Sequence, residues 1–124
     1  MASAVPSIRI KRVYAAAEAE DGARVLVDRL WPRGISKARA ALDLWFKEIA
    51  PSPGLREWFH QDPAHWPAFV ERYRAELDRH PAAVEQLAGF ARKGRLTLIY
   101  AAHDPEHNHA LVLADYLRAF LADA

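Results

Sequence analysis

The sequence predicts a small α/β protein. It would be a three-layer sandwich with a short, mostly parallel sheet of about three or four strands and a long helical crossover. Residues 8–14, 24–30 and 96–101 have the length and the apolar or alternating pattern of strands. Residues 36–93 place apolar side chains three and four positions apart, which is typical of helices. Strands that alternate with helices indicate the α/β class.

The length and composition indicate one domain. A chain of 124 residues with 52% hydrophobic and 27% charged residues can form one hydrophobic core. We expect a single domain over residues 1–124, with residues 1–7 as a loose leader. The helical crossover at 36–93 is long for so small a domain, and part of it could form a subdomain.

The charge balance and the absence of cysteine exclude several functions. The chain has 17 Lys and Arg residues and 16 Asp and Glu residues, which gives a net charge of +1. This charge predicts neither a nucleic-acid partner nor a membrane partner. No apolar run approaches the roughly 20 residues that span a bilayer. The first residues lack the pattern of a signal peptide. With no Cys, disulfides and thiolate chemistry are excluded. We therefore expect a cytoplasmic protein.

The three strand segments differ in their patterns. Residues 8–14 alternate between polar and apolar side chains, which predicts a half-exposed strand near a sheet edge. Residues 24–30 and 96–101 are apolar on both sides, as expected of central strands. The Ala/Glu/Asp segment 15–23 is shorter than the usual parallel crossover, so the pattern leaves the direction of the first strand open.

Helix boundaries follow from capping residues, prolines and glycines. Asp104 followed by Pro105 has the signature of an N-cap and first helical position, so the last helix should begin there. A helix that Ser36 caps should continue to Ile49. The predicted helices cover residues 38–49, 53–59, 66–77, 84–93 and 105–121.

Polar side chains gather where the two central strands end. The candidate ligand-binding residues are Asp28, Arg29, Trp31, Arg33 and Asn108, and the residues around the second strand end also include His103, Asp104, His107 and His109. If the two strands are parallel neighbours, these groups lie together. Arginine matches phosphate or carboxylate, and a helix N-terminus favours anions. We expect a pocket that binds a small anionic or phosphate-bearing molecule.

The same segment offers groups for proton transfer. Asp104, His107 and His109 would act as acids or bases near neutral pH, in hydrolysis or group transfer rather than in redox chemistry. In the alternative interpretation, Asp28 and Arg29 form a structural ion pair and Asp104 is only a helix cap. Trp31 fits a pocket wall and a core position equally well.

A metal site is a further alternative. His103, His107 and His109 carry the imidazole ligands that Zn or Fe prefers. His103 and His107 share a face only if residues 103–107 are helical, which a helix that starts at residue 105 does not favour. His107 and His109, two positions apart, share a face only in an extended segment. A compact irregular loop could still bring the three together. The cofactor remains unknown, with a divalent metal as one possibility.

Three motifs resemble a known family. They are Val27-Asp-Arg-Leu-Trp-Pro-Arg-Gly34, Asp43-Leu-Trp45 with the residues up to Ser52, and Glu106-His-Asn-His109. Together they resemble the YeaO-like branch of the domain of unknown function 488 family, over residues 8–121. The resemblance implies membership of a bacterial family without an established activity. It also favours parallel strands joined by the short segment 15–23.

The sequence departs from the broader family pattern at its thiol positions. That pattern has Asp-x-Arg after one strand, which Asp28-Arg29 approaches, and Cys-Ala-Glu…His-Cys-His-Arg after another. Tyr100 replaces the first Cys, Asn108 the second and Ala110 the Arg. Sulfur-based chemistry is therefore excluded in this branch. A non-catalytic module that senses a ligand, or that docks a partner or a second copy through its helices, is the alternative to an enzyme.

Overall fold

The computed structural model describes residues 7–122, which contain a four-stranded parallel sheet. Its strands are β1 (Ile8–Arg12), β2 (Ala23–Leu26), β3 (Leu44–Trp45) and β4 (Leu96–Tyr100). They lie in the order β1-β4-β2-β3, and each neighbouring pair is parallel. The predicted α/β class, the edge position of the first strand and the central positions of the next two predicted strands are confirmed. The second predicted strand ends at Leu26, four residues earlier than expected.

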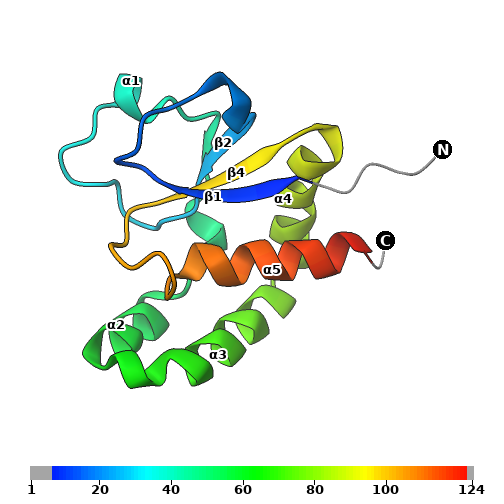
Figure 1. The fold of residues 1–124 in the computed structure, drawn as a ribbon. Helices are drawn as coiled ribbons and strands as arrows, with labels where there is room; N and C mark the ends of the chain where they lie inside the picture. The colour runs from blue at the N-terminus through cyan, green and yellow to red at the C-terminus, as the bar shows by residue number, and fades with distance from the viewer. Residues whose placement is uncertain (1–6, 123–124) are drawn as a thin grey trace.

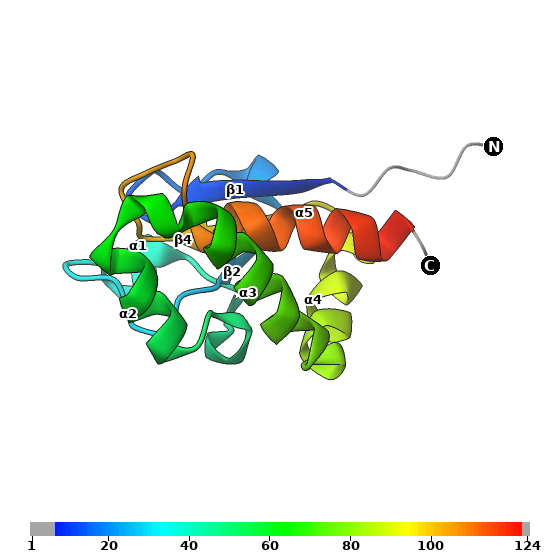
Figure 2. The same ribbon diagram turned by 90° about the horizontal axis from the view of Figure 1, so that it is seen from below.

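Helices lie mainly on one side of this sheet. They are α1 (Lys37–Ala40), α2 (Pro53–Gln61), α3 (Trp66–Asp78), α4 (Pro81–Lys93) and α5 (His109–Ala122), with short 3-10 turns at Ala19–Asp21, Lys47–Ile49 and Pro63–His65. Figure 1 shows α5 beneath β1 and β4, with α2 and α3 farther from the sheet. Figure 2 shows α3 and α5 across the front of the sheet. Within the described residues, no helix combines the length and apolar character needed to cross a membrane.

Alternate residues of the strands face two hydrophobic clusters. Val25 and Leu98 belong to the larger cluster, which packs against α2 to α5. Leu26 and Ile99 point to the opposite side, where they meet a smaller cluster formed with Ile35 and Ala40 from the segment after β2. This second side is covered by loops and the short α1 rather than by long helices.

The predicted helix over residues 38–49 is wrong. α1 ends at Ala40, and Ala41 adopts a left-handed conformation with φ 48°. The Arg24 guanidinium takes the carbonyl of Ala40 at 2.8 Å and that of Ala41 at 3.2 Å. A continuing helix would need both carbonyls for its own N–H groups. The chain instead forms β3, so the helical crossover starts at Pro53 and the segment 36–93 is interrupted by a strand.

The predicted start of the last helix is also wrong. The Asp104 carboxylate accepts the backbone N–H of Glu106 at 2.9 Å and that of His107 at 3.2 Å, which makes a local turn. α5 begins at His109, and the Asn108 side chain accepts the N–H of Leu111 at 2.9 Å in the manner of an N-cap. The four residues after Asp104 therefore form a loop at the edge of the site.

Candidate functional site

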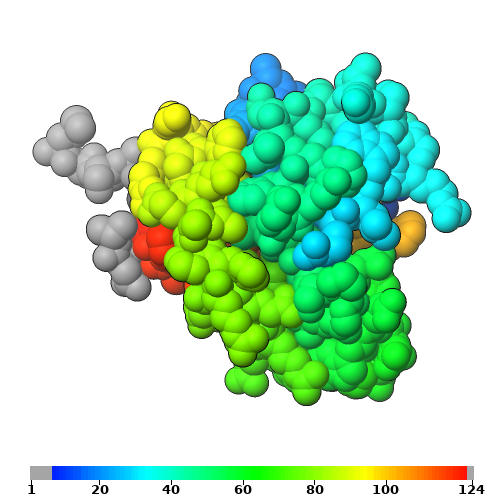
Figure 3. All heavy atoms as spheres, turned by 180° about the vertical axis from the view of Figure 1, so that it is seen from behind, coloured from blue at the N-terminus to red at the C-terminus, as the bar shows by residue number. Residues whose placement is uncertain are grey.

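A pocket opens at the carboxyl ends of β2 and β4, between these strand ends, α2 and the start of α5. We call it the strand-end pocket. Its volume is about 230 Å³, and it is lined by Asp28, Arg29, Leu30, Ala50, Pro51, Arg56, Phe59, His60, Phe69, Ala101, Ala102, His107, Asn108 and His109. In the view from behind, the cyan segment after β2 lies directly above the green surface of α2 and α3 (Figure 3). Ligands of open parallel sheets bind at this end of the strands.

Asp28 ties the two strand ends together. One of its carboxylate oxygens, Oδ2, accepts the backbone N–H of Ala101 at 3.1 Å, and its carbonyl accepts the indole N–H of Trp45 at 2.8 Å. The other carboxylate oxygen, Oδ1, lies 2.9 Å from Nε2 of His109. Asp28 therefore binds Trp45 of β3 and the residue that follows β4, while His109 of α5 lies against its second carboxylate oxygen.

His109 donates a hydrogen bond at the end of β2 through its Nε2 atom. Its Nε2 atom lies 3.0 Å from the carbonyl of Val27 as well as 2.9 Å from Asp28. Both neighbours are acceptors, so Nε2 must carry a hydrogen. The hydrogen points toward the Val27 carbonyl, which leaves Asp28 Oδ1 close to the imidazole without an aligned hydrogen bond. His109 thus fixes the strand ends rather than offering Nε2 to a ligand as a base.

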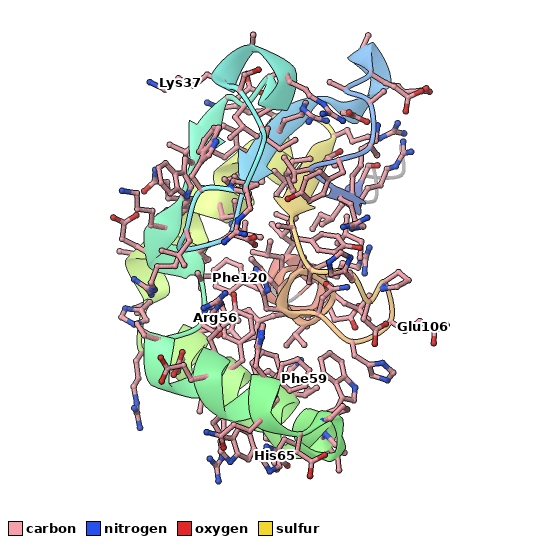
Figure 4. The ribbon with its side chains drawn as sticks, turned by 90° about the vertical axis from the view of Figure 1, so that its left-hand side faces the viewer. Lys37, Arg56, Phe59, His65, Glu106 and Phe120 are labelled. Atoms are coloured by element: carbon pink, nitrogen blue, oxygen red, sulfur yellow. The ribbon has the colours of Figure 1, made fainter. Side chains whose placement is uncertain are left out.

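Arg29 and Arg56 bring positive charge to the pocket from different elements. Arg29 follows β2, and its Nη2 donates to the carbonyls of Ala50 at 3.3 Å and Pro51 at 3.5 Å. Its Nε is buried without a partner among the described residues. Arg56 comes from α2 and is exposed. Figure 4 shows Arg56 and Phe59 on the side of α2 nearer the sheet and α5, with His65 at the outer side.

His60 is a neutral neighbour of the two arginines. Partial burial lowers the pKa of His60 from its ordinary value of 6.5, and the charges of Arg56 and His109 lower it further. The imidazole therefore stays uncharged at neutral pH and can donate one hydrogen bond and accept another. It lies one helical turn after Arg56, so both side chains reach the pocket from the same face of α2.

Asp104 and His107 form an exposed pair at the mouth of the pocket. His107 Nδ1 lies 2.9 Å from the Asp104 carboxylate, and about half of each side chain is exposed. The N–H of Glu106 and then the His107 imidazole hold the pKa of Asp104 below its ordinary value. The His107 and Trp66 rings also pack in a T-shaped arrangement, with centroids 5.1 Å apart. This pair orients the imidazole with Nδ1 toward the carboxylate.

Five of the predicted site residues line the strand-end pocket: Asp28, Arg29, His107, Asn108 and His109. Asn108 is only 1% exposed, and it uses both ends of its amide within the chain. Its Oδ1 caps α5, and its Nδ2 donates to the Asp104 carbonyl at 2.9 Å. Its structural role therefore accounts for its position beside the pocket.

The other predicted residues lie outside the lining. Trp31 donates its indole N–H to the Ile35 carbonyl at 2.6 Å and packs against Trp45. Arg33 is exposed, and its backbone carbonyl accepts a hydrogen bond from the Tyr14 hydroxyl. His103 lies 3.5 Å from the Arg12 guanidinium, outside the pocket. The loop after β2 thus turns Trp31 toward the opposite side of the sheet, into the smaller cluster.

The candidate metal ligands do not converge. Within residues 7–122, no three His, Asp or Glu side chains are grouped closely enough to hold a metal ion. His107 pairs with Asp104, His109 pairs with Asp28, and His103 faces Arg12. The loop 103–108 therefore does not bring the three histidines together.

Reasoning from the sequence missed the contribution of α2. Arg56, Phe59 and His60 lie three or four positions apart, which places them on one face of a helix. This spacing was available as a signal of a mixed polar and aromatic face. What the spacing does not give is that this face docks over the ends of β2 and β4.

Comparisons with known proteins identify the family of this chain. A family model described as "Inactive DUF488-N3 subclade" matches residues 7–124. The chain is 53% identical over 113 residues to "Uncharacterized protein YeaO" of Escherichia coli, covering 91% of this chain and 98% of that protein. It is 40% identical over 110 residues to "Uncharacterized protein Rv3073c" of Mycobacterium tuberculosis, covering 89% of this chain and 92% of that relative. No solved structure gives a significant match. The chain therefore belongs to the DUF488 family, as a YeaO-like member.

Proposed function

We propose that this protein binds a small anionic molecule, carrying a phosphate or a carboxylate, in the strand-end pocket. The observation that carries the proposal is the pairing of Arg29 and Arg56 in one lining whose only acidic side chain is Asp28. Asp28 already accepts the N–H of Ala101 and lies against His109, so its charge is partly offset. The pocket is therefore net positive, as an anion site requires.

Arg29 is suited to anchor the ligand. The carbonyls of Ala50 and Pro51 hold its Nη2, which fixes the direction of the guanidinium before a ligand arrives. A fixed guanidinium loses less rotational freedom on binding than a free one. Arg56 and the neutral His60 complete the site from α2, and His60 can hydrogen-bond to an anion oxygen without changing the net charge.

Binding without a chemical step is the form of this function that we favour. The pocket lining contains no Ser, Thr, Cys, Lys or Tyr side chain that would serve as a nucleophile. The description of the matching family model as an inactive subclade supports the same choice. We further propose that the protein works in the cytoplasm, where phosphorylated metabolites are concentrated.

Titration with inorganic phosphate, followed by calorimetry at constant ionic strength, tests the anion site. Arg29→Gln and Arg56→Gln should each weaken binding by roughly 5- to 150-fold, the equivalent of about 1–3 kcal/mol for a charge-assisted hydrogen bond. Arg79→Gln is the matched control, because Arg79 is exposed and lies outside the lining. Equal affinities for all three variants and the wild type would refute the proposal. Circular dichroism of each variant separates lost binding from lost folding.

Hydrolysis is the second candidate, and the Asp104–His107 pair favours it. With Nδ1 directed at the carboxylate, His107 can use Nε2 as a general base toward a water molecule in the pocket. The measurement is release of inorganic phosphate from a phosphomonoester. Release by the wild type that disappears in His107→Gln, while phosphate binding persists, would establish catalysis. No release by the wild type would leave the binding function alone.

A further inference from the structure

The strand-end pocket has an apolar part that a bare anion does not use. Half of its fourteen lining residues are apolar: Leu30, Ala50, Pro51, Phe59, Phe69, Ala101 and Ala102. The volume of about 230 Å³ is also far more than a phosphate ion of five heavy atoms needs, since one water occupies about 10–15 Å³ of such space. An inorganic anion beside Arg29 and Arg56 would leave most of this space to water.

Phe59 forms a fixed wall in this apolar part, and Phe69 lies behind it. The rings of Phe59 and Phe69 stack with centroids 4.5 Å apart and an interplanar angle of 27°. Trp66 packs on both, with centroid distances of 5.6 and 5.7 Å. Phe69 is 1% exposed. The wall is therefore held from behind, so a flat group can pack against it without first ordering it.

Leu30 extends the apolar surface to the rim of the pocket. It is 62% exposed, far more than Tyr14, the other large exposed hydrophobic residue among residues 7–122. It directly follows Asp28 and Arg29, so it lies where the charged and apolar parts of the pocket meet. A ligand held by Arg29 would cover Leu30 if it also carried an apolar body.

We propose that the strand-end pocket selects an anion that carries an aromatic ring, with the charged group at Arg29 and Arg56 and the ring against Phe59 and Leu30. This inference rests on the proposed anion-binding function and names the class of ligand. An arginine pair beside a fixed aromatic wall matches a phosphate or carboxylate joined to a flat ring.

The test compares phenyl phosphate with methyl phosphate, which have the same charged group and differ in the ring. Calorimetry should give a Kd for phenyl phosphate about tenfold or more below that for methyl phosphate, from burial of the ring and its packing on Phe59. Arg56→Gln should weaken both ligands by the same factor. Equal affinity of the wild type for the two esters would overturn this inference and leave the anion site intact. Failure to bind either ester or inorganic phosphate would overturn both proposals.

Two variants test where the aromatic ring of the ligand lies in the pocket. Phe59→Leu keeps an apolar side chain but removes the ring, and Leu30→Ala shortens an exposed side chain that the fold does not depend on. Each should reduce the ratio of the two affinities by about threefold or more, while Tyr14→Ala, outside the lining, should keep the ratio of the wild type. A ratio unchanged by both pocket variants would overturn the assigned position of the ring. If Phe59→Leu fails to fold, Leu30→Ala decides the question.

Discussion

Gly22 determines how closely the turn before β2 approaches the turn before β4. Its φ is 66°, and a Cβ atom built there would lie 2.3 Å from the carbonyl oxygen of Arg95. That carbonyl accepts the N–H of Ala23 at 2.9 Å, so it cannot move away without loss of the bond. We expect Gly22→Ala to lower the free energy of unfolding by about 2–3 kcal/mol, from the left-handed backbone and the contact together.

Urea unfolding of Gly22→Ala beside Gly89→Ala measures this effect. Gly89 lies within α4, and a Cβ atom there would meet no atom within 4 Å. Because alanine favours helix over glycine, Gly89→Ala should raise the free energy of unfolding by about 0.5–1 kcal/mol. An unchanged or raised free energy of unfolding in Gly22→Ala would contradict the role given to Gly22.

At the scale of residues, the sequence predicts the positions of Asp28 and Arg29 but not that of Trp31. Asp28 and Arg29 follow an apolar run directly, so their place at a strand end could be predicted. Trp31 could not be placed, because its direction depends on the hydrogen bond to the Ile35 carbonyl and on the ring of Trp45. These partners come from a loop and a strand whose positions only the folded chain defines.

At the scale of elements, the Asn108 side chain caps the start of α5. Asn108 is buried, and its side chain makes two hydrogen bonds of 2.9 Å, to Leu111 N–H and the Asp104 carbonyl. Asn108→Ala should therefore lower the free energy of unfolding by about 1–2 kcal/mol. Asp104→Ala should cost less, since its carboxylate is about half exposed. Thermal unfolding of the two variants checks this order, and the reverse order would return the cap to Asp104.

Local patterns misplaced two helix boundaries for a physical reason. The Asp104 side chain accepts the N–H groups two and three residues later, which is also the bonding of an N-cap. The pattern is thus the same whether a helix or a loop follows. For residues 38–49 the apolar spacing fits a helix, but the guanidinium of Arg24, distant in sequence, takes the carbonyls of Ala40 and Ala41. Such tertiary contacts override local preference.

On the scale of the whole molecule, a buried ionic network links β1 to the start of β2. Asp21 is 1% exposed and accepts hydrogen bonds from Arg24 at 2.6 Å and from Lys11 at 3.0 Å. Burial alone would raise the pKa of Asp21, but the N–H of Glu18, Lys11 and Arg24 together hold it below its ordinary value of 3.8. The charged carboxylate is therefore the form that the fold stabilises.

Lowering the pH should remove the stabilisation that the charged Asp21 carboxylate provides. Because the folded-state pKa of Asp21 is lowered, its contribution is complete above about pH 4 and is lost as the pH falls through the lower folded-state value. Asp21→Asn should cost about 3 kcal/mol at pH 7, since Arg24 keeps a buried charge without its partner. The difference from the wild type should shrink below pH 4. Denaturant melts across pH measure this.

Asp115→Asn is the control for this measurement. Asp115 also pairs with an arginine, Arg118 at 2.9 Å, but both side chains are about half exposed or more. Exposed pairs contribute little to stability, so this variant should differ from the wild type by less than about 0.5 kcal/mol at every pH. An equal pH dependence in the two variants would show that burial of Asp21 is not the cause.

The class of the fold was predictable at this scale, whereas the composition of the pocket was only partly so. Apolar strands separated by helical segments give a parallel sheet, because parallel neighbours need crossovers. The docking of α2 onto the strand ends depends on packing between segments about thirty to fifty positions apart in sequence. That Arg56 and His60 line the pocket therefore follows only from the folded structure.

The strand order has a consequence for how the chain is made. β1 and β2 do not pair with each other; each pairs with β4, which lies between them in the sheet and comes last of the four strands in the sequence. A nascent chain leaving the ribosome therefore carries β1 unpaired until residues 96–100 emerge. The backbone N–H and C=O groups along the edges of β1 stay unpaired until then. Because these pairings close loops of about seventy to ninety residues, folding of the complete chain should be slow for its size.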